Sequence, residues 1–92
     1  MVNETYLKEL SDKVLEAETQ RNYFESEAGL KFLEFLKVIR EDAFNKFYNN
    51  IGDPSAHRQV LHNYDAIISY FNSVEKSGLS ATKKLVEYQK VN

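Results

Sequence analysis

The sequence predicts an all-α protein: a long antiparallel helical hairpin with an additional N-terminal helix and a short C-terminal helix. Two amphipathic segments of about two dozen residues, free of internal proline, flank the stretch 49–54. In that stretch Asp53 can cap the second segment, and Pro54 suits its first helical position, where the missing N–H costs nothing. No segment alternates polar and apolar residues with the period of a strand. We expect one domain over residues 1–92, with helices at about 4–24, 26–49, 54–77 and 81–90.

The first predicted helix has a heptad-like apolar seam. Asn3 can cap it, and the seam comprises Leu7, Leu10, Val14, Ala17 and Phe24. An isolated helix of this length is marginal in water. It must therefore pack on the hairpin, on a second copy of itself or on a partner protein.

The second predicted helix is apolar over more than half of its circumference, so we expect it to have neighbours on two sides. Ser26 can cap it, and Glu27 suits the positive end of the helix dipole. The stretch 25–28 contains no strong helix breaker, so this helix could also continue from the first with only a bend. Gly29 costs up to about 1 kcal/mol inside a helix, which the close approach of another backbone usually offsets.

The third predicted helix carries apolar residues at spacings of three and four from Val60 to Val74. Gly78 is typical of a left-handed residue that ends a helix, with Leu79 making the apolar contact that often follows. Ser80 can then cap the short last helix.

The residue types do not favour an enzyme. There is no cysteine, and the only histidines, His57 and His62, lie about 140° apart on a helix and cannot bind one metal ion together. Serines and threonines have no partners arranged for nucleophilic attack, and three isolated glycines make no phosphate loop. We therefore expect no cofactor, no metal ion and no small-molecule substrate.

The charge pattern does not favour nucleic acid either. The net charge is −2, whereas a duplex binder needs a basic stripe that displaces counterions. The best candidates for a phosphate contact are Lys83, Lys84 and Lys90, although the role of a solubilising tail suits them better. The chain begins without a secretory signal and contains no apolar run long enough for a membrane span, so we expect a cytoplasmic protein with no membrane contact.

Three elements of the sequence form a recognisable pattern: an aromatic-x-Ser-x-x-Gly element at 24–29, the Asp53-Pro54 turn, and a Gly-x-x-Ala-x-x-x-Leu element at 78–85. With these elements, residues 17–85 resemble small α-helical accessory proteins of tailed bacteriophages. The turn departs from the pattern, since Ser55-Ala56-His57 follows the proline where acidic residues are usual. The resemblance implies a phage protein in the host cytoplasm or in the virion, and it brings no catalytic residues.

Two functions follow as expectations. The first is a structural or assembly protein of a phage particle (a minor virion, packaging or scaffolding component) that acts through helix–helix contacts. The alternative is a phage-encoded inhibitor or modulator of a host enzyme, such as an anti-restriction or anti-CRISPR protein or a modulator of host transcription. Nucleic-acid binding is a third choice. We expect protein partners and a homo-oligomer formed through the first helix. The candidate partner-binding residues are Leu7, Leu10, Val14, Tyr23, Phe35 and Tyr48.

Overall fold

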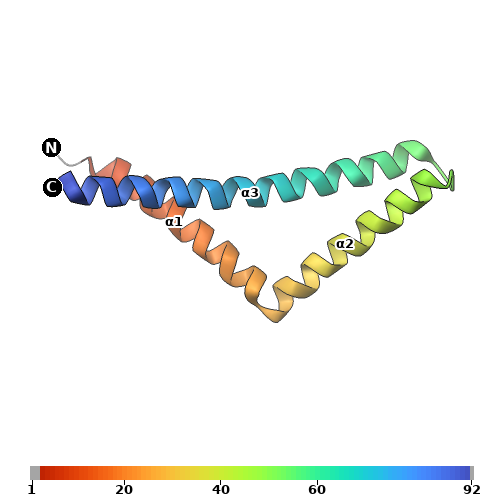
Figure 1. The fold of residues 1–92 in the computed structure, drawn as a ribbon, viewed down its shortest axis with the longest axis horizontal. Coiled ribbons are helices and arrows are strands. Elements are labelled where there is room, and N and C mark those ends of the chain that lie inside the picture. The colour runs from red at the N-terminus through yellow and green to blue at the C-terminus, as the bar shows by residue number, and fades with distance from the viewer. Residues whose placement is uncertain (1–2, 92) are drawn as a thin grey trace. The chain divides into compact units, whose positions relative to one another are not determined.

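The computed structural model describes residues 3–91, and all its regular elements are helices (Figure 1). They are α1 (Glu4–Glu25), α2 (Glu27–Tyr48) and α3 (Pro54–Val91). No strand occurs over this range. The all-α prediction is therefore confirmed, and α1 and α2 lie within one residue of the helices predicted at 4–24 and 26–49.

Each helix begins at a side chain that accepts hydrogen bonds from the first turn. The Tyr6 N–H donates to Asn3 Oδ1 at 3.1 Å, the Gly29 N–H to Ser26 Oγ at 3.1 Å, and the Ser55 N–H to Asp53 Oδ1 at 3.0 Å. These bonds satisfy N–H groups that have no partner inside the helix. The capping residues expected from the sequence thus set all three starts.

Ser26 alone separates α1 from α2. Its backbone is extended, with φ −76° and ψ 161°, so the chain cannot continue as a helix through this residue. The alternative of a continuous bent helix over the first two segments is therefore wrong. Because the Ser26 hydroxyl binds the N–H of Gly29, the break is a specific cap.

Removing that cap should destabilise the protein. We expect Ser26→Ala to lower the free energy of unfolding by about 1 kcal/mol, and Ser26→Asp, which keeps an acceptor oxygen, to restore most of it. Thermal unfolding followed by circular dichroism measures both changes. Ser11→Ala, at an exposed position within α1, is the control and should be neutral or slightly stabilising. Equal losses in Ser26→Ala and Ser26→Asp would contradict the capping role.

The predicted end at Gly78 and the separate helix at 81–90 are both wrong, because α3 runs through Gly78 without a break. Gly78 is buried, and a Cβ built on it would overlap the Cβ of Ala17 in α1. The glycine therefore serves a close helix approach rather than a left-handed turn. Leu79 is 62% exposed and covers no helix end.

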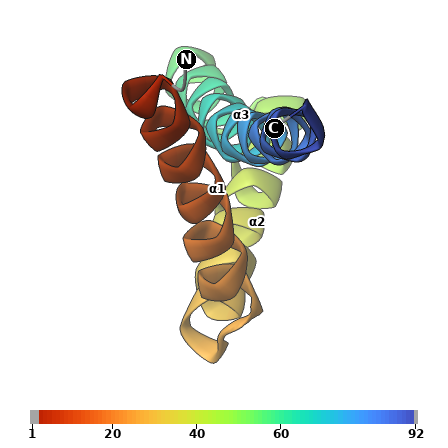
Figure 2. The same ribbon diagram turned by 90° about the vertical axis from the view of Figure 1, so that its left-hand side faces the viewer.

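The contacts of the chain form two compact units, each described separately below. The first, here called the α1–α3 unit, joins the chain up to Tyr23 with the chain from Phe71 onward. Its two helices are antiparallel, because Arg21 forms a 2.7 Å ion pair with Glu75 whereas Ala17 meets Gly78. Figure 2 shows α1 in red to orange and the last part of α3 in blue. Gln20 Nε2 donates to the Phe71 carbonyl at 2.9 Å. Its core consists of Leu10, Ala17, Val74, Gly78 and Ala81, all buried.

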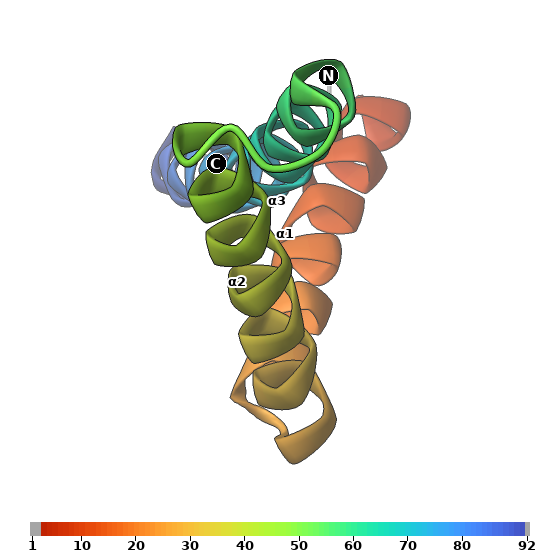
Figure 3. The same ribbon diagram turned by 90° about the vertical axis from the view of Figure 1, so that its right-hand side faces the viewer.

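The second unit, here called the hairpin unit, spans residues 24–70. It holds α2, the turn at 49–53 and the first part of α3, and Figure 3 shows the turn in the foreground. The Arg40 guanidinium lies 5.5 Å from the centre of the Tyr64 ring, and that of Arg58 lies 5.6 Å from the centre of the Phe47 ring. Residues later in α2 thus contact residues earlier in α3, so the two helices are antiparallel.

Candidate protein-interaction surface

The hairpin unit leaves many large apolar side chains in solvent. Of the fourteen that are exposed among the described residues, eight lie on α2 or in the turn after it. They are Leu30, Phe35, Val38, Ile39, Phe44, Phe47, Tyr48 and Ile51. Single exposed apolar residues are ordinary, but a gathering of this kind is typical of a surface that binds another protein.

The helical period explains why so much of α2 is exposed. Its buried residues, Gly29, Leu36 and Ala43, are seven apart and form one narrow stripe. The other large apolar side chains of α2 lie on both sides of that stripe. Within the hairpin unit, no α3 residue from 54 to 70 is fully buried, so one helix pair covers only the centre of its apolar surface.

The densest part of the exposed surface lies beside the turn, and we call it the hairpin tip: Phe44, Phe47, Tyr48, Ile51 and Arg58. The rings of Phe44 and Tyr48 stack with their centres 6.3 Å apart and an interplanar angle of 15°. Tyr48 is 75% exposed, the highest value among the exposed large apolar side chains. Tyrosine, phenylalanine and arginine are enriched in protein interfaces, so the composition suits protein recognition.

The turn holds the hairpin tip in a defined conformation. Asn50 is left-handed, with φ 58°, and the N–H groups of Ile51 and Asn50 donate to the carbonyls of Lys46 and Phe47 at 2.9 and 3.3 Å. This is a Schellman motif, in which the two bonds satisfy the last carbonyls of α2. His57 Nε2 lies within hydrogen-bonding distance of the Ile51 carbonyl. Ile51 is thus fixed at both of its peptide groups, which lowers the entropy lost on binding a partner.

The structure distributes the six predicted partner-binding residues over both units. In the α1–α3 unit, Leu10 is only 3% exposed, Leu7 and Val14 are half-buried, and Tyr23 is 44% exposed. In the hairpin unit, Phe35 and Tyr48 are exposed, and only Tyr48 belongs to the hairpin tip.

The rest of the hairpin tip was not predicted from the sequence. Phe44 and Phe47 lie one and four residues after the buried Ala43, so their spacing also fits an apolar face that packs inside the protein. Their position in the last two turns of α2, close to the turn at 49–53, is the signal that could have identified them.

The lysines proposed to contact phosphate lie on the last three turns of α3. Lys83, Lys84 and Lys90 are all exposed, and Lys83 and Lys90 share a face because they are seven residues apart. Glu87 stands between them in the sequence and is also exposed. The three lysines therefore form part of a mixed surface rather than a continuous basic stripe.

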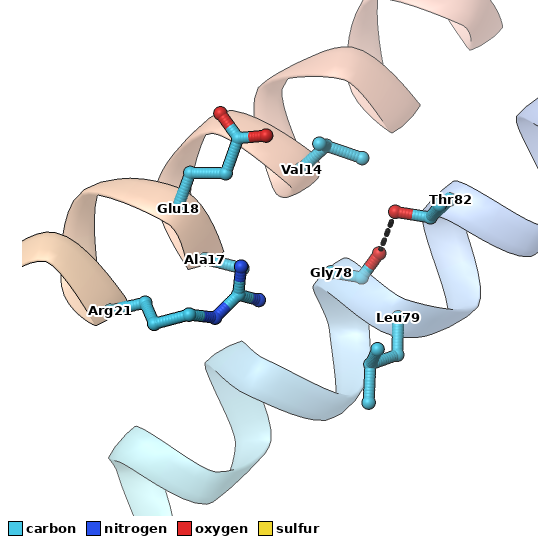
Figure 4. Close-up of a pocket in the computed structure, with 7 residues that line it drawn as sticks. All are labelled: Val14, Ala17, Glu18, Arg21, Gly78, Leu79 and Thr82. Atoms are coloured by element: carbon cyan, nitrogen blue, oxygen red, sulfur yellow. Dashed lines mark hydrogen bonds between the residues drawn. The ribbon is translucent and has the colours of Figure 1, made fainter.

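A small hollow lies beside the contact between Ala17 and Gly78 in the α1–α3 unit (Figure 4). Its volume is about 50 Å³, and Val14, Arg21 and Thr82 contribute to its lining. The Thr82 hydroxyl donates to the Gly78 carbonyl at 2.9 Å, as the figure shows. Ligand sites are usually about 300–1,000 Å³, so this hollow has room for water molecules only.

Comparisons with protein-family models, with curated proteins and with solved structures find no match to this chain. Within residues 3–91, no helix is long and apolar enough to cross a membrane. The same part of the chain contains no group of three or more side chains placed to hold a metal ion.

Proposed function

We propose that this chain is a non-enzymatic assembly protein that binds another protein through its hairpin tip. The observation that carries the proposal is the exposed apolar surface of α2 and its turn, where stacked aromatic rings stand beside a hydrogen-bonded turn. Binding there would remove Phe44, Tyr48 and Ile51 from water at about 25 cal/mol per Å² of apolar area. The fixed turn supports this role, since little conformational freedom remains to be lost.

The resemblance to accessory proteins of tailed phages suggests which protein is bound. We propose a component of a phage particle or of its precursor, with this chain acting as a minor virion, packaging or scaffolding factor. The chain would then be found in the host cytoplasm and, for a virion component, in the finished particle.

Two measurements test this role. Mass spectrometry of procapsids and virions, purified from an infection by the phage that carries the gene, should find the chain in one of them at a fixed ratio to the capsid protein. Its absence from both would overturn the assembly role. Capture of one host enzyme from lysate at a fixed ratio, with no particle component, would overturn it in favour of an inhibitor.

A substitution that introduces a charge tests whether the protein binds through the hairpin tip. We expect Phe44→Glu to reduce incorporation into particles at least tenfold, because a carboxylate would be desolvated in the apolar interface. Val86→Glu is the matched control, since Val86 is 44% exposed and Phe44 is 47% exposed, and Val86 lies outside the hairpin tip. Circular dichroism must show both variants folded. Equal incorporation of the two variants would contradict binding through this surface.

A further inference from the structure

A second surface of α2 is complementary to itself. Six side chains follow one another along the helix at intervals of four, four, three, four and four residues: Glu27, Lys31, Phe35, Val38, Asp42 and Lys46. These spacings keep them on one face, which we call the palindromic stripe. The order of intervals is the same from either end, and its centre lies midway between Leu36 and Lys37.

The chemistry of the stripe also matches when the helix is reversed. In sequence order the side chains are negative, positive, apolar, apolar, negative and positive. If a second α2 lies antiparallel across the centre, Glu27 faces the second copy's Lys46, Lys31 faces its Asp42, and Phe35 faces its Val38. Every charge then meets the opposite sign and every apolar side chain meets an apolar one, as a twofold-symmetric interface requires.

Ion pairs within one α2 helix already hold the charged side chains of the palindromic stripe together. Lys31 pairs with Glu27 at 3.1 Å and Lys46 with Asp42 at 2.9 Å, so each end of the stripe carries one compact ion pair. Phe35 and Val38 between them are 61% and 54% exposed. Two such helices would form a four-charge network at each end of an apolar centre.

The order of charges supports a second copy as the occupant. A second copy carries the matching order of charges and apolar side chains in its own sequence, as a twofold-symmetric interface requires. The first helix, by contrast, has Leu10 of its expected seam buried inside its own chain.

We propose that two copies of this chain form a dimer in which their α2 helices lie antiparallel along the palindromic stripe. The interface differs from the hairpin tip, because Phe44 and Tyr48 lie on another face of α2. The dimer therefore does not depend on the proposed function, and each can fail without the other.

Cysteine cross-linking tests the geometry directly, since the natural chain has no cysteine. Lys31 and Asp42 are about 16 Å apart along one helix, which is too far for a disulfide within a chain. In the proposed dimer, however, Lys31 of each copy lies close to Asp42 of the other copy. We expect mixed Lys31→Cys and Asp42→Cys chains to form a cross-linked heterodimer on mild oxidation. Neither variant should cross-link alone. Self-cross-linking of Lys31→Cys, or no cross-link in the mixture, would overturn the antiparallel pairing.

Sedimentation equilibrium tests the dimer itself. At high micromolar concentration the natural chain should sediment at twice 10.7 kDa. Phe35→Glu should raise the dissociation constant at least tenfold by placing a carboxylate in the apolar centre. Leu15→Glu is the control, because Leu15 is also 61% exposed but lies on α1, and it should leave the dimer unchanged. A monomeric natural chain, or equal effects of the two substitutions, would overturn the proposal.

Discussion

Replacing Leu10 with alanine is expected to lower the free energy of unfolding by about 2–4 kcal/mol. Leu10 is 3% exposed in the α1–α3 unit, where only a few side chains are fully buried. Removing its branched end takes away apolar burial and leaves a cavity that two helices cannot fill by small shifts. For a domain of this size the loss is a large fraction of the total stability.

Urea unfolding followed by circular dichroism measures this effect. The control is Leu15→Ala, the same change in the same helix at a residue that is 61% exposed, and it should cost less than about 0.5 kcal/mol. The comparison also separates two roles for Leu10, which the sequence had suggested as a partner-binding residue. Similar stabilities for Leu10→Ala and Leu15→Ala would contradict the burial of Leu10.

Gly78→Ala is expected to destabilise the protein by about 1–3 kcal/mol, although alanine is the better helix former. In an exposed position of a helix this substitution would stabilise by up to about 1 kcal/mol. Here the new methyl group would overlap the Cβ of Ala17 and would lie 3.4 Å from the Lys13 carbonyl oxygen. α1 would have to move away from α3, which would loosen the contacts of Val14 and Ala17.

The reverse exchange provides the test. The double variant Ala17→Gly with Gly78→Ala moves the methyl group from one helix to the other and removes the overlap. It should be more stable than the sum of the two single effects predicts, by at least about 1 kcal/mol. Thermal unfolding of the four proteins completes the cycle. Strictly additive effects would contradict the close approach of the two helices.

Much of the fold could be predicted because it depends on local chemistry. Asn3, Ser26 and Asp53 each supply an acceptor for the N–H groups of a first turn, and Pro54 fixes the start of α3, so these boundaries follow from a few neighbouring residues. The predicted helix end at Gly78 was wrong because it, too, was based on neighbouring residues alone. Locally it is typical of a helix end, whereas its actual role depends on Ala17, sixty-one residues away in the chain.

The apolar pattern on both sides of Gly78 indicates that α3 continues through this residue. From Phe71 through Val74, Gly78, Ala81, Leu85 and Tyr88, the spacing of three and four residues continues without interruption. A glycine at a seam position of that pattern indicates a place where two helices meet closely, and this reading would have predicted an unbroken α3.

The candidate surface was predictable only in part. Phe35 and Tyr48 were among the partner-binding candidates, and both are exposed. Leu10 was also a candidate but is buried, whereas Phe44 was not a candidate and is exposed. Their exposure depends on which other helix covers each segment, and no periodicity within one helix contains that information.

The contact between Ala17 and Gly78 also fixes the axial register of α1 against α3. Two helices with repeating apolar seams can slide by one heptad and still bury similar surfaces. In this pair a slide of seven residues would bring Ala17 against Phe71 or Leu85, and either side chain would hold the helices apart. Gly78 is the only glycine in the 38 residues of α3, so α1 has a single site along that helix at which it can approach so closely.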